Sequence, residues 1–366
     1  MNTFVPLDWY YPLYINLSLF WVLFTLLHTG ILQMNSTKNL AFINISGYFL
    51  LFFSILYIGQ RPPSAAFGDT INYYRGYLAY EKGAAISENV GDYGWHLLMQ
   101  ASAQVVPINI FFTLCAFIYI FPLYKISKEF FKEYWYYAFI MFILSYSFWT
   151  YGVNGVRNGA AGSLFLWGVS YHRKKVLMAL FFFFAISFHK TLFLPVLAFV
   201  STYFYNNPKV FFKGWLACIP LSLVLGSVWI ALFASLGFGG DDRLAGYLTS
   251  EAAEGTFSST GFRWDFLFYS GFAVFAGYYF VIKKKFKDPL YFKLLNTYLI
   301  CNGFWILVIR ANYSNRFAYL SWFMMAIIII YPLLKQQFFK KQHLIIGKVM
   351  LAYFAFTYFM YYFYKL

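Results

Sequence analysis

The sequence reads GVNGVRNGAAGSLFLWGVSYHRKK from Gly152 to Lys175 and continues through an apolar segment to SFHK at residues 187–190. Arg157 stands inside an apolar segment that opens with glycines and an asparagine. His189 lies where the next apolar segment is interrupted. A cation in a membrane helix costs about 2.5–3.5 kcal/mol at the helix centre and less near the interface. Such a residue therefore usually has a partner or a function.

The composition is that of a multi-spanning membrane protein. Of 366 residues, 61% are hydrophobic and 11% are charged, whereas a soluble domain carries about 25% charged residues. The net charge of +15 does not indicate a partner nucleic acid, because the lysines form short clusters between long apolar runs. The three cysteines all fall inside apolar runs, without metal-site or disulfide spacing. We expect neither a metal nor a cofactor.

Apolar runs long enough to cross a membrane recur along the whole chain. A span needs about 17–25 residues, and the segment from Lys175 to Tyr205 is too long for one span, so it predicts two short helices that meet at His189. We expect an all-α, polytopic integral membrane protein with about 12 transmembrane segments, forming one transmembrane domain over residues 1–366. The other helices are expected near residues 12–33, 40–58, 107–124, 134–151, 154–171, 214–236, 264–282, 289–309, 317–334 and 344–363.

Charge sets the expected orientation. Lysine clusters occupy alternate connections, which the positive-inside rule places in the cytoplasm. Seven of the eight arginines then face outward, and only Arg173 faces inward. Guanidinium groups bind phosphate bidentately and keep their charge when desolvated, so this bias predicts an outer site for a phosphorylated ligand. Outer loops 59–106 and 237–263 are expected to cover it, the first with an interfacial helix over Glu88–Val106.

Three residues are candidates for catalysis. Arg157 is expected in the first turn of a helix capped by Asn154, where the amides and the dipole favour a phosphate; the glycines around it also fit close helix packing. Imidazole in general titrates near neutrality, so His189 suits proton removal from a sugar hydroxyl, although an interfacial histidine bonded to a helix-end carbonyl is the alternative. Asp69 is a carboxylate that could orient hydroxyls or act as the base.

Further candidates would bind the diphosphate or the glycan. The structural alternatives are a solvated loop with interface tyrosines, snorkelling of a lysine, and anchoring of arginines in lipid headgroups. These candidates are Arg61, Tyr73, Arg75, Lys190, Arg310 and Arg316.

Several short motifs, taken in order, resemble the bacterial O-antigen and exopolysaccharide repeat-unit polymerases of the Wzy/EpsG type. They are an arginine after the second span, GDTINYYRGY at residues 68–77, ENVGDYGWHLL at 88–98, GVRNGAA at 155–161, FHK at 188–190 and SNRFAY at 314–319. The motif at residues 88–98 adds Glu88 to the candidate residues. The family usually has glutamine where this chain has Asn158.

The resemblance implies a glycosyltransferase that joins undecaprenyl-diphosphate-linked oligosaccharide repeats at the outer, periplasmic face of the bacterial inner membrane. It would release undecaprenyl diphosphate and use no nucleotide-sugar donor. Its partners would be lipid-linked oligosaccharides, membrane lipids and a chain-length regulator. A lipid-linked oligosaccharide flippase or other transporter is the alternative from another class, and a glycan acyltransferase is the alternative enzyme. The sugars, the linkage and the stereochemistry cannot be read from the sequence.

Overall fold

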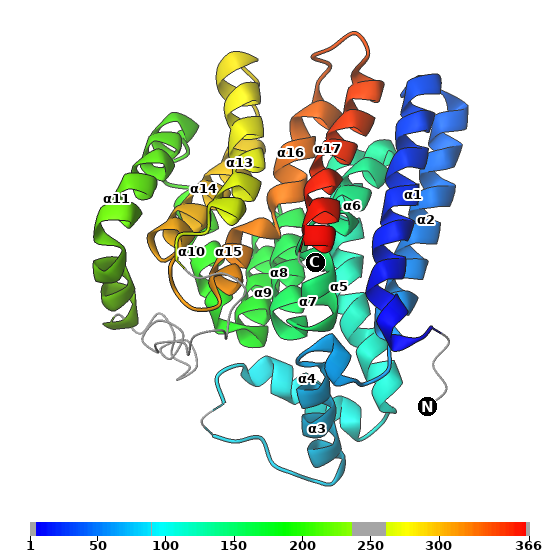
Figure 1. The fold of residues 1–366 in the computed structure, drawn as a ribbon, viewed down its shortest axis with the longest axis vertical. Helices are drawn as coiled ribbons and strands as arrows, with labels where there is room; N and C mark the ends of the chain where they lie inside the picture. The colour runs from blue at the N-terminus through cyan, green and yellow to red at the C-terminus, as the bar shows by residue number, and fades with distance from the viewer. Residues whose placement is uncertain (1–4, 89, 236–260, 364–366) are drawn as a thin grey trace. The chain divides into compact units, whose positions relative to one another are not determined.

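The computed structural model describes residues 5–88, 90–235 and 261–363, and within them every regular element is helical (Figure 1). The predicted outer loop 237–263 lies almost wholly outside the described residues. The chain is a multi-pass membrane protein, although the number of about 12 spans stays a prediction. In the described ranges, seven helical segments are long and apolar enough to cross a membrane: Leu7–Ile31, Thr37–Gly59, Ile108–Ile143, Pro208–Phe233, Trp264–Lys283, Ser314–Lys335 and Gln342–Phe363.

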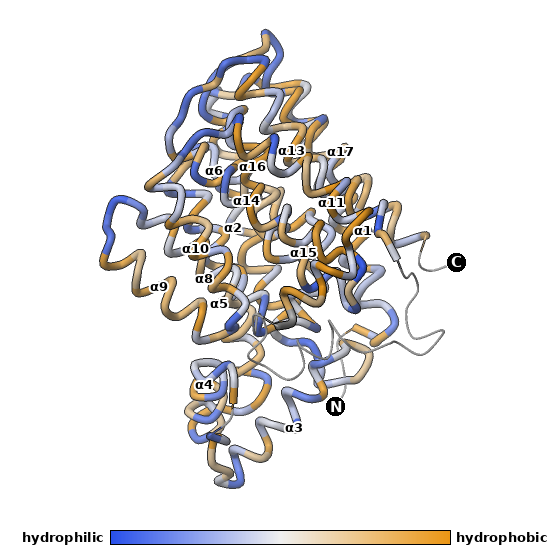
Figure 2. Tube along the Cα trace, turned by 90° about the vertical axis from the view of Figure 1, so that its left-hand side faces the viewer, coloured by the Kyte–Doolittle hydropathy of each residue, from blue (hydrophilic) through white to orange (hydrophobic). Residues whose placement is uncertain are grey.

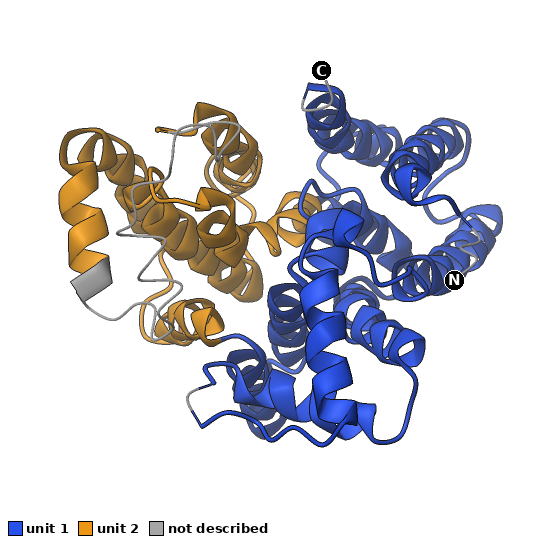
Figure 3. Ribbon diagram, turned by 60° about the horizontal axis from the view of Figure 1, so that its bottom comes forward, with its two compact units in different colours: residues 1–189, 333–366 blue, residues 190–332 orange. Residues whose placement is uncertain are grey.

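The chain divides into two compact units (Figure 3). Unit 1 comprises Met1–His189 and Leu333–Leu366, and unit 2 comprises Lys190–Pro332. Each unit is described by itself below, and a single transmembrane domain over residues 1–366 stays a prediction.

Unit 1 is a bundle in which α5 packs against both α2 and α8, α8 packs against α9, and α1 packs against α17. The long helices are apolar, while the turn that joins α8 to α9 is strongly hydrophilic (Figure 2). Its helices are α1 (Tyr10–Ile31), α2 (Thr37–Gly59), α3 (Thr70–Glu81), α4 (Tyr93–Ala103), α5 (Ile108–Phe131), α6 (Trp135–Ile143), α7 (Phe148–Val153), α8 (Val156–Ser170), α9 (Lys175–Phe188) and α17 (Gln342–Phe363).

The predicted helix 134–151 is wrong as one element, because the chain breaks between α6 and α7. A helix end leaves carbonyl groups without partners. Distant side chains supply donors here: the Tyr14 hydroxyl donates to the Ile143 carbonyl at 2.5 Å, and Thr357 Oγ1 donates to the Leu144 carbonyl at 2.9 Å. The break is therefore stabilised by α1 and α17, and it sets the direction in which α7 enters the site.

The predicted break at His189 is confirmed. Helix α9 ends at Phe188, His189 is extended with φ −155°, and α10 (Phe193–Ser201) follows a short 3-10 turn. The predicted helix over Glu88–Val106 is shorter than expected, since α4 begins only at Tyr93. Whether α4 lies at the membrane interface stays a prediction.

Unit 2 contains α11 (Pro208–Ser235), α13 (Trp264–Tyr278), α14 (Pro289–Leu307), α15 (Ser314–Trp322) and most of α16 (Met325–Lys335). Its buried centre contains a polar network around Asn302. Asn302 Oδ1 accepts from Trp215 Nε1 at 2.7 Å, and Asn302 Nδ2 donates to the hydroxyls of Ser270 and Ser321. This network joins α11, α13, α14 and α15. Asp288 caps α14 by accepting from the amides of Leu290 and Tyr291.

Candidate functional site

Arg61 follows α2 and is almost completely buried, with 2% of its surface exposed. Its guanidinium donates to the Ile58 carbonyl at 2.6 Å, to Thr70 Oγ1 at 3.0 and 3.3 Å, and to the Val153 carbonyl at 3.4 Å. Burial lowers the pKa of Arg61 to about 10. These donors point into the protein, so the geometry is that of a positioning residue. Direct contact of Arg61 with a diphosphate stays a prediction.

The start of α3 is fastened to the break between α7 and α8. Thr70 Oγ1 donates to the Val153 carbonyl at 2.5 Å, and the Asp69 amide donates to Asn154 Oδ1 at 2.8 Å. Gly68 precedes this contact with φ +59°, and a Cβ there would collide with the Asn154 side chain. The left-handed backbone and the missing side chain both favour glycine at this position.

The prediction that Asn154 caps the helix of Arg157 is wrong. The residue at the N-cap of α8 is Gly155, and no side chain caps the helix. Asn154 instead ends α7, and its side-chain oxygen is engaged by the Asp69 amide. The carboxamide therefore joins two segments that are 85 residues apart, which a local helix-start pattern could not reveal.

Arg157 lies in the first turn of α8, as the sequence predicted. Its Nη1 donates to Asp92 Oδ2 at 2.6 Å, and the two side chains are 20% and 4% exposed. Tyr73 on α3 lies beside them and is buried. Burial raises the pKa of the Tyr73 hydroxyl, while the charge of Arg157 and a hydrogen bond from it act in the opposite direction. Arg157 is thus an accessible cation held by a buried carboxylate and a buried phenol.

His189 lies at the same end of unit 1 as these residues. The two residues before it contact α4: a Cβ on Gly94 would collide with Ser187, and the Phe188 ring lies 6.0 Å from that of Trp95. Trp95 also contacts the Tyr73 ring at 5.3 Å. Helix α4 therefore connects the Arg157 neighbourhood to the end of α9, where the half-buried His189 side chain begins the break.

The remaining candidates of the first outer loop are less enclosed. Asp69 is half-buried, and its Oδ1 accepts from Asn72 Nδ2 at 3.2 Å. Arg75 and Glu88 are exposed, on α3 and in the loop before α4 respectively. Lys190 is exposed and begins unit 2. The structure thus brings Asp69, Tyr73, Asn154 and Arg157 together and leaves Arg75 and Glu88 on the surface.

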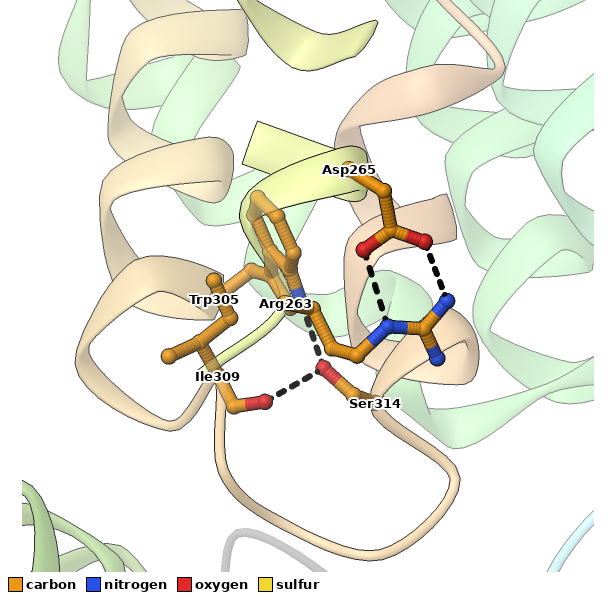
Figure 4. A network of polar contacts seen from close by, with 5 residues as sticks. All are labelled: Arg263, Asp265, Trp305, Ile309 and Ser314. Carbon is orange, nitrogen blue, oxygen red and sulfur yellow. Dashed lines mark hydrogen bonds and ion pairs between the residues drawn. The ribbon is translucent and has the colours of Figure 1, made fainter. Parts of the chain in front are cut away.

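Unit 2 carries the other predicted arginines on and beside the turn between α14 and α15. Ser314 holds this turn: its hydroxyl accepts from Trp305 Nε1 at 2.9 Å and donates to the Ile309 carbonyl at 2.8 Å (Figure 4). Arg310 is exposed, and its side chain runs past Gly226 of α11. The Arg316 guanidinium lies 4.7 Å from the centroid of the Tyr313 ring.

The same figure shows a third arginine whose charge is already compensated. Arg263 forms two hydrogen bonds with the Asp265 carboxylate, at 2.9 and 2.6 Å, and lies over the Phe266 ring. Binding of a diphosphate by Arg310 and Arg316 stays a prediction.

Sequence reasoning missed Asp92 and Thr70. Both lie inside the motifs that carry the family resemblance, yet the candidates taken from these two motifs were Asp69, Tyr73, Arg75 and Glu88. Their importance comes from contacts with residues that are distant in the sequence: Asp92 lies 65 residues from Arg157, and Thr70 lies 83 residues from Val153. The sequence did offer one signal: Asp92 is an acidic residue, and Thr70 carries a hydroxyl, within the two motifs at residues 88–98 and 68–77.

The arrangement in unit 1 offers groups that could contact an anion and a sugar. In the ranges that the structure describes, no three His, Cys, Asp or Glu side chains are grouped so that they could hold a metal ion. Arg157 can bind phosphate oxygens, Asp69 and Tyr73 can contact hydroxyl groups, and His189 can accept a proton. Together with the apolar helices, these features define a polytopic membrane protein with an arginine-centred polar site at one end of its bundle.

Comparison with known families gives this class a name. The chain matches the EpsG family over residues 41–366 and belongs to that family. The match covers most of the chain, including every candidate residue discussed above. Membership indicates a polysaccharide polymerase-type role, that is, a glycosyltransferase-like enzyme. No curated protein and no solved structure matches the chain.

Proposed function

We propose that this protein joins undecaprenyl-diphosphate-linked oligosaccharide repeat units at the periplasmic face of the bacterial inner membrane. The growing glycan leaves its carrier and is transferred to the non-reducing end of a new lipid-linked repeat. The observation that carries the proposal is Arg157, a partly accessible arginine held by buried Asp92 at the N-terminus of α8. An arginine at a helix N-terminus is a favourable place for a phosphate group. The free backbone amides of the helix, the helix dipole and the two-pronged guanidinium group of the arginine all attract the phosphate.

The chemical step is a substitution at the anomeric carbon of the growing chain. An acceptor hydroxyl oxygen forms the new bond to that carbon, and the bond to the diphosphate oxygen breaks. The electron pair leaves with undecaprenyl diphosphate, and the proton of the hydroxyl passes to a base. The transition state has oxocarbenium character, so charge develops on the leaving diphosphate and on the ring together.

Arg157 is assigned to stabilising the negative charge that develops on the leaving diphosphate. Losing one preorganised contact to developing charge typically costs about 3–4 kcal/mol at the barrier. Arg310 and Arg316 are proposed as further diphosphate ligands from unit 2. Arg75, Glu88 and Lys190 are proposed to contact the diphosphate or the glycan from the exposed segments of the chain.

His189 is assigned as the base, with Asp69 as the alternative. A general base contributes roughly 10²–10⁴-fold to such a step. His189 lies at the helix break next to α4, while Asp69 lies at the start of α3, so both are at the end of unit 1 that holds Arg157. Tyr73 and Asn154 are assigned to positioning of Asp69 and Arg157.

The test is polymer formation by the purified protein from lipid-linked repeats, without nucleotide sugars or acyl donors. Arg157→Lys keeps the charge but loses the fork, and it should shorten or abolish the polymer. Arg173→Lys, in the lysine-rich turn after α8, is the matched control and should behave as wild type. His189→Ala should lose polymerisation while still binding the lipid. Full polymer length from Arg157→Lys would contradict the phosphate role.

A translocation measurement in vesicles separates the flippase from the polymerase. Translocation of the lipid-linked oligosaccharide across vesicles without chain growth would support a flippase. In the part of the chain that the structure describes, the fully buried ionised side chains are those of Arg61 and Asp92, and both lie outside the long spanning segments. Charged groups inside the spans are typical of a transport path, so the placement of these two charges favours the polymerase.

A further inference from the structure

We infer that Asp92 determines the carrier specificity of this site, by admitting lipids linked through a diphosphate and rejecting those linked through a single phosphate. The inference rests on the proposed function, because it assigns the ligand of Arg157. Asp92 is the anion that Arg157 holds in the absence of substrate, and a lipid headgroup must take its place.

The Arg157–Asp92 pair has the geometry of a contact that can be exchanged. Asp92 Oδ2 accepts from Arg157 Nη1 at 2.6 Å. Asp92 is 4% exposed and Arg157 is 20% exposed, so the cation is the partner that a ligand can reach. Arg157 belongs to a core helix of unit 1, whereas Asp92 precedes α4 and follows the exposed loop that begins after Glu81.

Asp92 has a second set of donors available on its own helix. It occupies the N-cap position of α4, yet its side chain makes no capping hydrogen bond there. Aspartate is among the best N-cap residues. Asp288, at the N-cap of α14 in the same chain, does accept from two amides, at 2.9 and 3.0 Å. Asp92 therefore pairs with Arg157 instead of with the amides of α4. When a ligand binds Arg157, the Asp92 carboxylate can turn to these amides.

Charge decides which ligand can drive this exchange. A lipid linked to a sugar through one phosphate carries a single negative charge, the same as the carboxylate that it replaces. A diphosphate link carries two charges and more oxygens for the guanidinium fork. Leaving a buried carboxylate without its cation is strongly unfavourable. Only the diphosphate gains enough attraction to Arg157 to offset that loss, while the N-terminus of α4 receives the displaced carboxylate.

The experiment measures equilibrium binding of two synthetic lipids to the full-length protein in detergent. Both lipids carry the same polyprenyl chain and the same single sugar, one through a diphosphate and one through a monophosphate. Wild type should prefer the diphosphate lipid by at least about tenfold, a difference of about 1.4 kcal/mol. The comparison uses the ratio of the two dissociation constants in one sample, which does not depend on the fraction of protein that is folded.

Asp92→Asn is the informative variant, because the amide keeps the shape and an oxygen acceptor but removes the competing charge. It should bind the monophosphate lipid about tenfold more tightly and lose most of the preference for the diphosphate. Asp92→Glu keeps the charge and should keep the preference. Asp265→Asn removes the ion pair with Arg263 in unit 2 and should leave the ratio unchanged.

Two results would overturn the inference while leaving the proposed function intact. One is a wild-type protein that binds both lipids equally, and this measurement does not require any variant to fold. The other is an Asp92→Asn protein that keeps the wild-type ratio. Binding of neither lipid by wild type would instead overturn the proposed function, and the role of Asp92 with it.

Discussion

Replacing Thr70 by valine should loosen the whole site, because its hydroxyl is the point at which three segments of unit 1 meet. The oxygen accepts from Arg61 Nε at 3.3 Å and from Arg61 Nη2 at 3.0 Å, and it donates to the Val153 carbonyl at 2.5 Å. Valine has nearly the same shape, so the change removes these hydrogen bonds and little else. Thr70 is fully buried and Arg61 is 2% exposed, so water does not replace the lost partner.

The expected cost follows from the type of bond that is lost. A hydrogen bond to a charged group contributes about 1.5–3 kcal/mol, and a neutral one contributes about 1 kcal/mol. The two hydrogen bonds from Arg61 share the Thr70 hydroxyl as their acceptor. Arg61 keeps its hydrogen bonds to the carbonyls of Ile58 and Val153 in the variant. We therefore expect Thr70→Val to destabilise unit 1 by about 3–4 kcal/mol. Thr70→Ser keeps the oxygen and loses one methyl group, which costs about 1 kcal/mol.

Thermal unfolding of the detergent-purified protein measures this difference. For a unit of this size, 1 kcal/mol shifts the midpoint by about 2–4 °C, so Thr70→Val should unfold roughly 10 °C below wild type. Thr70→Ser should stay much closer to wild type and should keep its polymerase activity. If Thr70→Val and Thr70→Ser unfold within about 2 °C of each other, the buried arginine does not depend on this hydroxyl and the positioning role is refuted.

Three further changes test other contacts. Gly68→Ala places a Cβ against the Asn154 side chain on a backbone with φ +59°, so it should reduce polymerisation by separating α3 from the α7–α8 break. Tyr137→Phe removes the hydroxyl that contacts Asn39 and His343 at 2.8 and 2.6 Å, and should lower the unfolding free energy by about 1–3 kcal/mol. Asn302→Leu leaves buried Trp215 Nε1 without its acceptor and removes one hydrogen bond each from Ser270 and Ser321, and should cost about 2–4 kcal/mol.

Two of these changes have a control in the same chain. Gly83→Ala shares the positive φ, at +88°, but a Cβ there meets nothing within 4 Å, so polymerisation should be retained. Tyr136→Phe loses only the contact with Thr25 at 2.7 Å and should cost less than Tyr137→Phe. Equal activity of the two alanine variants would contradict the role of Gly68. Equal stability of the two phenylalanine variants would contradict the role of the Tyr137 hydroxyl. An Asn302→Leu protein that unfolds at the wild-type temperature would contradict the role of the unit 2 network.

Much of the fold could be predicted from apolar run lengths. The helices predicted near residues 40–58 and 344–363 agree within a few residues with α2 and α17. A membrane span needs a long apolar segment, and such a segment is easy to recognise in the sequence. The break at His189 was visible because the apolar segment was too long for one span. The α6–α7 break was not visible, because Ile143 and Leu144 are apolar and their carbonyls are satisfied by Tyr14 and Thr357 from elsewhere.

By itself, the sequence determined that the chain is a helical membrane protein, that Arg157 begins a helix, and that His189 interrupts one. Local composition and periodicity control these properties, so they can be read without a partner. Only the tertiary structure decided that Arg61 is turned inward, that Asn154 holds Asp69 rather than capping α8, and that Asp92 is the counter-ion of Arg157. Which side chain satisfies a buried charge depends on helices packing across long sequence separations, and local patterns carry no information about that choice.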